Sequence, residues 1–508
     1  MHTLRYLACI LLIVFHLNAE PKKITVAGTG LTGLWAAYSV CRDLEDAGCG
    51  KDVTITIVGK WDWTSVLDAA AGQKTTIFSH EASGFGPMGI QPHSGLVWNT
   101  DNEVVGLVKK GIGHPEAAFY TAPNLEEAGR EFLDLYVGWH SRHPDSNDPA
   151  SSFQRQRSMI EINRYARQLW GEFSEEVKME TKIPLFLEGA WRLYDDPEHF
   201  QNALKSLDIL ERFHYGAQAF AQWEEIAGRV PFYETVITHD RKKGIFFSQD
   251  GLVDSNAVRR FLWKALLQER TGKPHVVLRL TEEVVKLVTD VERRPACCKG
   301  LELKSGEILF SDFTILATGL ANKTVLAQHN IELPLWSVWG AAVTARLKGG
   351  EGQVPHGGVS FHTQRCITAI PDGKTIIVAG TSMVIPANEV PTPDLYEQKL
   401  QLGLRAIFPN RYDENSLQFR VAPRTGIADD LPIIDCGTQM PCLAILNPTS
   451  HLGCTQSIAL GKLASSYILN ALGYTPKMPD LHEYRLDRFK ADLDQVRSAR
   501  KEGRVVLF

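Results

Sequence analysis

The chain has 508 residues, of which 44% are hydrophobic and 22% charged, and its formal net charge is −5 at pH 7. This length predicts two or three domains, each with a hydrophobic core. The charges form no long run of one sign, which excludes the basic footprint of a nucleic-acid-binding protein. The histidines do not cluster and no Cys-x-x-Cys spacing occurs, so we also expect no metal.

The first 20 residues, MHTLRYLACILLIVFHLNAE, differ from the rest of the chain. Arg5 precedes an apolar run at 6–15, and a polar exit ends near Ala19. The run is short for a membrane span, and its layout is typical of a secretory signal peptide. An uncleaved anchor is the main alternative, and a mitochondrial signal is less favoured. We therefore expect a protein of the secretory pathway or outside the cytoplasm, or one associated with a membrane through this segment.

Residues 24–40, ITVAGTGLTGLWAAYSV, run from a strand pattern through three glycines into a helix pattern. G-x-G-x-x-G spacing lets backbone N–H groups approach a pyrophosphate, and the helix N-terminus adds positive charge. A second strand pattern at 53–58 completes a βαβ unit. The sequence thus predicts a dinucleotide site formed by Gly28, Thr29, Gly30, Leu31, Thr32 and Gly33.

The second strand lacks the acidic residue that usually ends it and binds the adenosine ribose. It runs instead into Gly59, Lys60, Trp61 and Asp62. We predict that Asp62 takes this role, or that Lys60 contacts the nucleotide. The missing acid argues against NAD more strongly than against a flavin.

The next segment resembles the D-amino-acid oxidase and dehydrogenase superfamily of FAD enzymes. Residues 68–72, DAAAG, are similar to the family's turn beside the flavin, although a tight packed turn is an alternative. Segments at 189–197, 250–254, 313–319 and 334–340 are similar to later family segments in the same order. The likeness extends from about 24 to 469. It implies non-covalently bound FAD, with further contacts from Ala70, Ala71, Gly72, Ala317, Thr318 and Gly319.

The resemblance also implies an α/β fold, in which a Rossmann-type FAD-binding domain is interleaved with an α+β, antiparallel-sheet substrate domain. Antiparallel strands are expected at 341–347, 365–370 and 375–380. We expect Trp191, Trp336 and Trp339 in the core rather than in a pocket. The predicted division is 1–20 as signal peptide or anchor, 21–110, 236–330 and 416–475 as FAD-binding domain, 111–235 and 331–415 as substrate domain, and 476–508 as a helical tail.

Residues 420–432, RVAPRTGIADDLP, resemble the family segment Arg-Pro-x-x-x-Asp-x-x-Pro. Arg424 takes the arginine position, and the resemblance implies that it binds the substrate carboxylate. A guanidinium suits this role because its planar donors match both oxygens and it stays charged when desolvated. Arg420 is a rival candidate, and a structural salt bridge is the alternative role. Thr425 stands where the family has proline.

Residues 447–456, NPTSHLGCTQ, precede a helix pattern. The family often has Gly-His-Gly here, before a helix whose dipole stabilises negative charge on the reduced flavin. The resemblance implies cofactor contacts from His451, Leu452, Gly453, Cys454 and Thr455. Thr449 and Ser450 replace the flanking glycines, which predicts an altered loop.

Three further sequence features concern covalent chemistry. Cys297 and Cys298 are expected in a polar loop, as free thiols or with separate partners. Cys436 and Cys442 are close enough in sequence to form a bridge in an oxidising compartment. Asn322 begins an acceptor sequon, Asn-Lys-Thr. It follows the 313–319 segment so closely that we expect it to be buried and unmodified.

The leading hypothesis is FAD-dependent oxidation of the C–N bond of an amino acid, of the D-amino-acid or N-alkyl-glycine type. The α-hydrogen would leave as hydride to flavin N5, and the resulting imine would hydrolyse to a 2-oxo acid. Oxygen or a membrane quinone would then accept the electrons. The alternatives are a flavin-binding assembly or interaction factor with little turnover, and a nicotinamide-dependent dehydrogenase.

Overall fold

The computed structural model describes most of the chain: residues 21–60, 77–78, 87–90, 101–117, 119–142, 149–180, 185–194, 196–212, 214–226, 229, 243–348, 358–361, 365–369, 375–408, 410–448, 452–474 and 478–502. The predicted signal segment, Asp62, Ala70, Ala71, Gly72 and His451 lie outside these residues.

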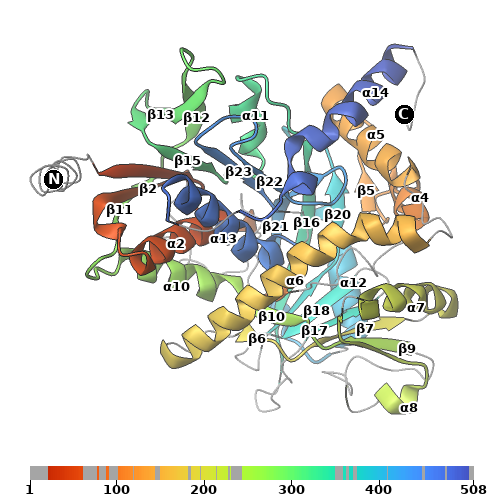
Figure 1. Ribbon diagram of the computed structural model, residues 1–508. Coiled ribbons are helices and arrows are strands. Elements are labelled where there is room, and N and C mark those ends of the chain that lie inside the picture. The colour runs from red at the N-terminus through yellow and green to blue at the C-terminus, as the bar shows by residue number, and fades with distance from the viewer. Residues whose placement is uncertain are drawn as a thin grey trace, which may run out of the picture.

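A six-stranded sheet carries the N-terminal glycine turn (Figure 1). Five of its strands are parallel, and only β22 runs antiparallel to its neighbour β23. Its order is β11 (His275–Leu280), β2 (Val53–Gly59), β1 (Lys22–Ala27), β15 (Phe313–Leu316), β23 (Leu443–Asn447) and β22 (Ile433–Cys436). This arrangement confirms the predicted α/β class, with strands far apart in sequence lying side by side.

Alternating side chains give this sheet two apolar faces. In β23, Ala444 and Leu446 pack with the helices on one face, whereas Leu443 and Ile445 join the core on the other. The helices on the first face are α2 (Leu31–Asp46), α6 (Pro149–Glu180), α10 (Ser255–Leu267) and α13 (Gly453–Ala471). Figure 1 shows α2 and α13 side by side, with the long α6 crossing the molecule.

The second large sheet of the molecule has eleven strands. Its central pairs β21–β16, β16–β19 and β19–β18 are antiparallel, which confirms the antiparallel strands predicted at 341–347, 365–370 and 375–380, while β17–β7, β20–β5 and β21–β3 are parallel. Its strands are β3 (Ile77–Phe78), β21 (Gln418–Ile427), β16 (Leu335–Arg346), β19 (Thr375–Ala379), β18 (Arg365–Ala369), β17 (Gly358–Phe361), β7 (Ala190–Tyr194), β9 (Lys243–Phe247), β8 (Ala217–Phe220), β20 (Ser382–Val384) and β5 (Phe119–Thr121).

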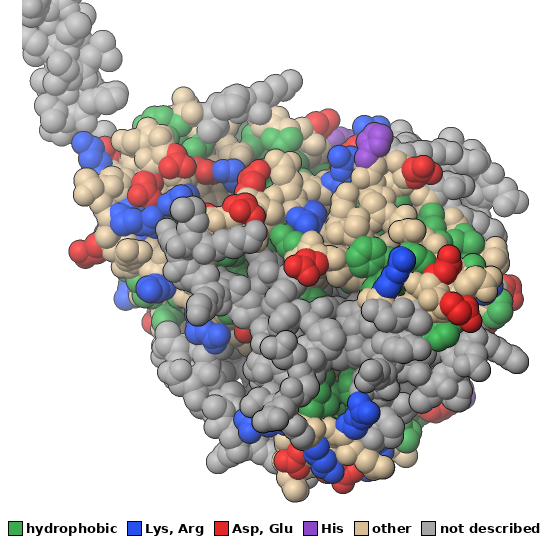
Figure 2. Space-filling model, turned by 90° about the horizontal axis from the view of Figure 1, so that it is seen from below, with side chains coloured by type: hydrophobic (Ala, Val, Ile, Leu, Met, Phe, Trp, Pro, Cys, Tyr) green, Lys and Arg blue, Asp and Glu red, His purple; other side chains and the backbone are tan. Residues whose placement is uncertain are grey.

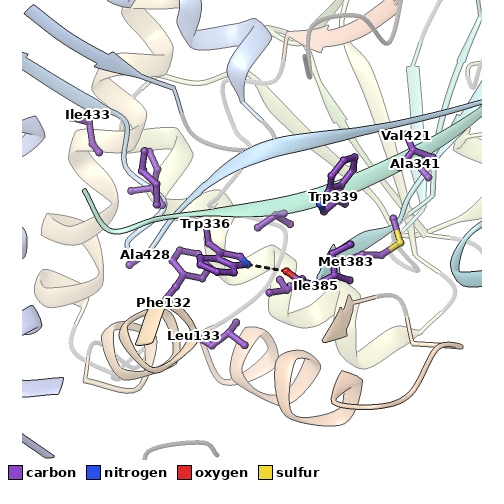
Figure 3. Close-up of a cluster of buried hydrophobic side chains, with 14 of the residues drawn as sticks. Phe132, Leu133, Trp336, Trp339, Ala341, Met383, Ile385, Val421, Ala428 and Ile433 are labelled. Atoms are coloured by element: carbon purple, nitrogen blue, oxygen red, sulfur yellow. Dashed lines mark hydrogen bonds between the residues drawn. The ribbon is translucent and has the colours of Figure 1, made fainter. Parts of the chain in front are cut away.

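The three predicted core tryptophans, Trp191, Trp336 and Trp339, are buried in one apolar cluster around this sheet. Figure 3 shows part of the cluster, in which the Trp336 indole N–H donates to the Ile385 carbonyl oxygen at 3.3 Å. This confirms that they belong to the core. The remaining helices are α4 (Asp101–Gly111), α5 (Glu127–Arg142), α7 (Pro197–Arg212), α8 (Trp223–Ile226), α11 (Ala321–Ala327), α12 (Glu397–Ile407) and α14 (Lys490–Lys501).

Two small sheets complete the fold. One is β4 (Pro87–Ile90), β10 (Gly251–Asp254) and β6 (Leu185–Phe186); the other is β12 (Val284–Asp290), β13 (Cys297–Leu303) and β14 (Ile308–Phe310). The expectation of a polar loop at Cys297 and Cys298 is wrong, because both open strand β13 and each is 1% exposed. Their apolar neighbours, not the charged residues before them, decide their environment.

The C-terminal segment packs against the rest of the fold through ion pairs. Arg500 pairs with Asp134 of α5 at 2.8 Å, and the Arg488 guanidinium forms two hydrogen bonds to Asp429, at 2.7 and 3.1 Å. Both members of the second pair are largely buried. The tail therefore fixes the turn that follows β21.

The surface is mixed in charge. On the face in Figure 2, basic and acidic side chains alternate over the described residues. Within the described part of the chain, no helix combines the length and apolar character that crossing a membrane requires. No group of three or more His, Cys, Asp or Glu side chains is placed to hold a metal ion among these residues.

Candidate active site

The glycine turn rests directly on the neighbouring strand. Gly28 has φ +118°, and a Cβ at this position would lie 2.2 Å from the Ala317 carbonyl oxygen. A Cβ on Gly33 would lie 2.0 Å from the Gly28 oxygen. The Gly28 N–H donates to Val58 at 2.8 Å, which ties the turn to β2 as well. Main chain thus packs closely against Gly28 and Gly33, which is the tight strand-to-helix turn that dinucleotide-binding proteins use.

Two helix N-termini meet at this edge. Gly30 caps α2 and Leu452 caps α13, and neither helix start has a side-chain cap. The Thr32 and Ser457 hydroxyls, from the N-terminal parts of the two helices, are 2.9 Å apart and buried. Uncapped N–H groups at two adjacent N-termini favour bound negative charge. The predicted residues of the turn and of 452–455 therefore lie at one place.

Thr29, between the first two glycines, adds a further polar group. It is 2% exposed, and its hydroxyl has no hydrogen-bond partner among the described residues. A buried hydroxyl without a partner is unfavourable in the protein alone. It is therefore available to a ligand at the turn.

Asn322 ties together the ends of β15 and β23. Its side-chain oxygen accepts from the Thr318 N–H at 3.0 Å and from the Thr318 hydroxyl at 2.6 Å. Its amide nitrogen donates to Asn447 at 2.6 Å and to the Leu446 carbonyl at 3.3 Å. Asn322 is fully buried, which confirms that its sequon faces packed structure.

The role of Asn322 was missed in the sequence because it was considered only as part of a sequon. The apolar strand pattern followed by Ala-Thr-Gly placed it at a strand end, but its partner Asn447 is more than a hundred residues away. Only the parallel pairing of β15 with β23 brings the two side chains together.

Arg424 lies in β21 and reaches across to β16. A Cβ on Gly340 would lie 2.2 to 2.5 Å from the guanidinium atoms of Arg424, so the guanidinium occupies the space that Gly340 leaves open. The next residue, Thr425, faces the loop that follows β15, with its hydroxyl 3.7 Å from a Cβ built on Gly319. This end of β21 therefore passes the Gly319 segment, while the Arg424 side chain leaves the strand on the other face, over Gly340.

Arg420 lies on the same face of β21, separated from Arg424 by Ala422. Because side chains alternate along a strand, both arginines and Ala422 face the same side. Ala422 packs there with Ala342 and Ile377 in a small buried cluster. Burial lowers the pKa of Arg420, while the nearby Asp254 carboxylate acts in the opposite direction. This face is a floor of small apolar side chains with a cation on either side.

Helix α6 supports the first turn of α13 from behind. The Trp170 indole N–H donates to the Thr455 carbonyl at 3.1 Å, and the Gln456 amide donates to Asn163 at 3.1 Å. The Cys454 thiol is buried, and burial raises its pKa to about 12, with a smaller contribution from Asp254. The Cys454 side chain is therefore a neutral thiol, and the group that it offers to a ligand at this helix start is its backbone N–H.

Lys60 lies apart from the glycine turn and the two helix N-termini, directly after strand β2. Its ammonium forms an exposed ion pair with Glu283 at 3.0 Å, which lowers the pKa of the Glu283 carboxyl. Both residues line an open cavity of ≈ 450 Å³ beyond the ends of β2 and β11. Ligands of parallel sheets bind at the carboxyl ends of the strands. The position of Lys60 beside this cavity is compatible with the predicted contact to the nucleotide.

Fold and site together define a dinucleotide-binding protein whose second large sheet carries two arginines on one face of β21. Residues 23–467 match the family described as FAD dependent oxidoreductase (DAO). The chain belongs to this family, and its cofactor is FAD. Three features of the site suit FAD: the glycine turn, the two uncapped helix N-termini and the buried Thr29 hydroxyl.

Similar proteins act on amino acids. The chain is 22% identical over 446 residues to a D-amino acid dehydrogenase of Neisseria meningitidis serogroup C, covering 88% of this chain and 95% of that protein. Glycine oxidase from Geobacillus kaustophilus has a TM-score of 0.60 at 12% identity, covering 92% of this chain and 98% of that one. L-proline dehydrogenase from P. horikoshii has a TM-score of 0.58 at 16% identity, with 93% and 98% covered. At these identities the two structures establish the fold alone.

Proposed function

We propose that this protein oxidises the C–N bond of an amino acid, of the D-amino-acid or N-alkyl-glycine type. The observation that carries the proposal is the position of Arg424, seated against Gly340 and followed by a residue that faces Gly319. The strand that carries Arg424 thus runs next to the Gly319 loop, which supports Arg424 as the group that would bind the substrate carboxylate. The names of the similar proteins, which include both oxidases and dehydrogenases, support the same substrate class.

The chain's own groups would bind and orient the substrate. The Arg424 guanidinium would hold the carboxylate through paired N–H donors. The apolar floor at Ala342, Ile377 and Ala422 would exclude water from the α-carbon. The first turn of α13 would stabilise negative charge that lies close to this helix N-terminus.

Bound FAD would supply the redox chemistry, by accepting the α-hydrogen as hydride at N5. No side-chain base is needed for this transfer, because the amine nitrogen itself supplies the electrons that form the imine. The imine would then react with water to give a 2-oxo acid and release ammonia or an amine.

Anaerobic mixing tests the proposal. The FAD-loaded protein is combined with a panel of D-, L- and N-methyl amino acids, and its absorbance near the yellow flavin band is followed. Loss of that colour with at least one member, and formation of the matching 2-oxo acid, is expected. A yellow protein that keeps its colour with every member would contradict it, and would favour a flavin-binding factor with little turnover.

Two aspects need separate measurements. Reoxidation of the reduced protein by oxygen and by a soluble quinone would identify the electron acceptor. We propose, from the apolar run at 6–15, that the N-terminal segment directs the protein to the secretory pathway or to a membrane. Sequencing the N-terminus of the protein from its native source would test this.

A further inference from the structure

Two cysteines from distant parts of the chain have their sulfur atoms in contact. The Sγ atoms of Cys297 and Cys442 are 3.1 Å apart, although 145 positions separate the residues. Cys297 opens β13, and Cys442 immediately precedes β23. Even carbon atoms pack best at about 3.5–4.0 Å, and sulfur is larger. The two thiols are thus closer than ordinary packing brings such atoms.

Backbone hydrogen bonds hold both segments around this contact. The Cys298 N–H donates to the Pro441 carbonyl at 3.0 Å, and the Thr314 N–H donates to the Cys442 carbonyl at 2.9 Å. The Cys442 N–H donates to the Tyr467 hydroxyl at 3.1 Å. Cys442 also has φ +66°, a conformation that non-glycine residues adopt rarely. The sulfur atoms are therefore placed by their surroundings on both sides.

The neighbouring cysteines have other partners. The Cys298 thiol faces Thr314 Oγ1 at 3.4 Å and the Gly300 carbonyl at 3.7 Å. Cys436 lies opposite Ala444 in the β22–β23 pair. The bridge between Cys436 and Cys442 that the sequence left open is therefore not the pairing that the structure favours.

We propose that Cys297 and Cys442 form a disulfide bond that joins the β12–β13–β14 sheet to strand β23. The oxidant is a disulfide compound of an oxidising compartment, of the glutathione disulfide class. One protein thiolate attacks it, forming a mixed disulfide and releasing one small thiolate. The second protein thiolate then displaces the other small thiolate, so the two cysteines lose two electrons and the oxidant becomes two thiols.

The bond would act on the cofactor site through β23. This strand ends at Asn447, which bonds to Asn322 in the site. A cross-link over a long stretch of chain restricts the unfolded state, and thus stabilises the folded one. Cys442 is partly exposed and Cys297 is buried, so the oxidant would reach Cys442 first. The bond would fasten the start of β23, the strand whose other end the buried asparagines connect to β15.

Peptide mapping tests the bond. Full-length, FAD-loaded protein is incubated with glutathione disulfide, blocked with iodoacetamide in denaturant and digested without reductant. Burial, followed by the Cys297 contact, raises the pKa of Cys442 to about 12, so the incubation is long and is repeated at rising pH. A linked peptide lighter than its two free parts by two hydrogen atoms is expected.

Variants assign the bond, because one tryptic peptide, 294–299, contains both Cys297 and Cys298. The link is expected to persist in Cys298→Ser and Cys436→Ser, and to disappear in Cys297→Ser and Cys442→Ser. Reductant should lower the melting temperature of the wild type but not of Cys297→Ser. Full alkylation of both thiols in the wild type, or a link that survives in Cys297→Ser, would overturn the proposal. The second tryptic peptide, 425–462, also contains Cys436 and Cys454, so if a variant at 297 or 442 fails to fold, a link that persists in Cys298→Ser, Cys436→Ser and Cys454→Ser decides the matter.

Discussion

The two halves of the site are built in different ways. The glycine turn after β1 is made of backbone, and its tight contacts, from Gly28 to Ala317 and from Gly33 to Gly28, join main chain to main chain. The arginine in β21 is a side chain, and its position depends on the absence of a side chain on another strand, at Gly340. The cofactor half is thus fixed by main-chain conformation and packing, and the substrate half by where the β16–β21 register places a side chain. Changes in the two halves should therefore separate FAD binding from substrate binding.

The largest effect is expected from Gly28→Ala, in the cofactor half. The new Cβ would overlap the Ala317 carbonyl, and φ +118° is strained for alanine. We expect FAD affinity to fall by about 100-fold or more. Titration of apoprotein with FAD, followed by fluorescence, measures this. Gly106→Ala, where a Cβ meets nothing within 4 Å, is the matched control. Unchanged affinity in Gly28→Ala would mean that FAD does not lie on this turn.

Arg424→Ala should affect the substrate half alone. Loss of a charged, paired contact to the carboxylate is expected to lower kcat/KM by about 1,000-fold, with bound FAD retained. Arg424→Lys should recover part of this loss, since it keeps the charge without the paired geometry. Arg405→Ala, which removes an exposed ion pair on α12, serves as control. A change of only a few-fold in Arg424→Ala would exclude Arg424 as the carboxylate site.

Gly340→Ala tests the register itself. Its methyl group would occupy the place of the Arg424 guanidinium, so the arginine must move although it is still present. We expect kcat/KM to fall by about 10- to 100-fold, chiefly through KM, with FAD content unchanged. Gly138→Ala, in open space on α5, controls for the added methyl group. Wild-type kinetics in Gly340→Ala would show that substrate binding does not depend on the position of the Arg424 guanidinium over residue 340.

Asn322→Ala should give the smallest effect. Asn322 affects the cofactor half only indirectly, through the ends of β15 and β23 that it connects. Several buried groups, among them the Thr318 N–H and the Asn447 side chain, would lose a partner. We expect a lower melting temperature and about tenfold weaker FAD binding. Thr324→Ala removes the same sequon without touching the amide, and should match the wild type. If both variants behave alike, Asn322 does not organise the strand ends.

The sequence predicted the cofactor half better than the substrate half, and the reason is physical. The spacing of Gly28, Gly30 and Gly33 between a strand and a helix pattern is a local signature of a backbone turn. The fold class, the antiparallel pairs around β16 and the burial of Asn322 were predicted correctly for similar reasons.

Contacts between distant strands could not be predicted in the same way. The resemblance singled out Arg424, but nothing local shows that Gly340 lies beneath it, because the β16–β21 register sets that contact. The same applies to Asn322 with Asn447, and to Cys442, whose neighbour proved to be Cys297 and not Cys436. The acidic partner of Lys60, Glu283, likewise comes from another part of the chain. The predicted contacts at Asp62, Ala70, Ala71, Gly72 and His451, outside the described residues, stay predictions, as do the domain boundaries.

The central claim is that Arg424 holds a carboxylate next to the flavin. The most direct test uses the analogue of the best substrate in which hydrogen replaces the amine, since it keeps the carboxylate but cannot be oxidised. Its binding is followed through the flavin absorption spectrum in the wild type and in Arg424→Ala. We predict a saturable spectral shift in the wild type and binding weaker by about 100-fold or more in the variant. Equal affinity in the two proteins, with FAD bound to both, would contradict the account.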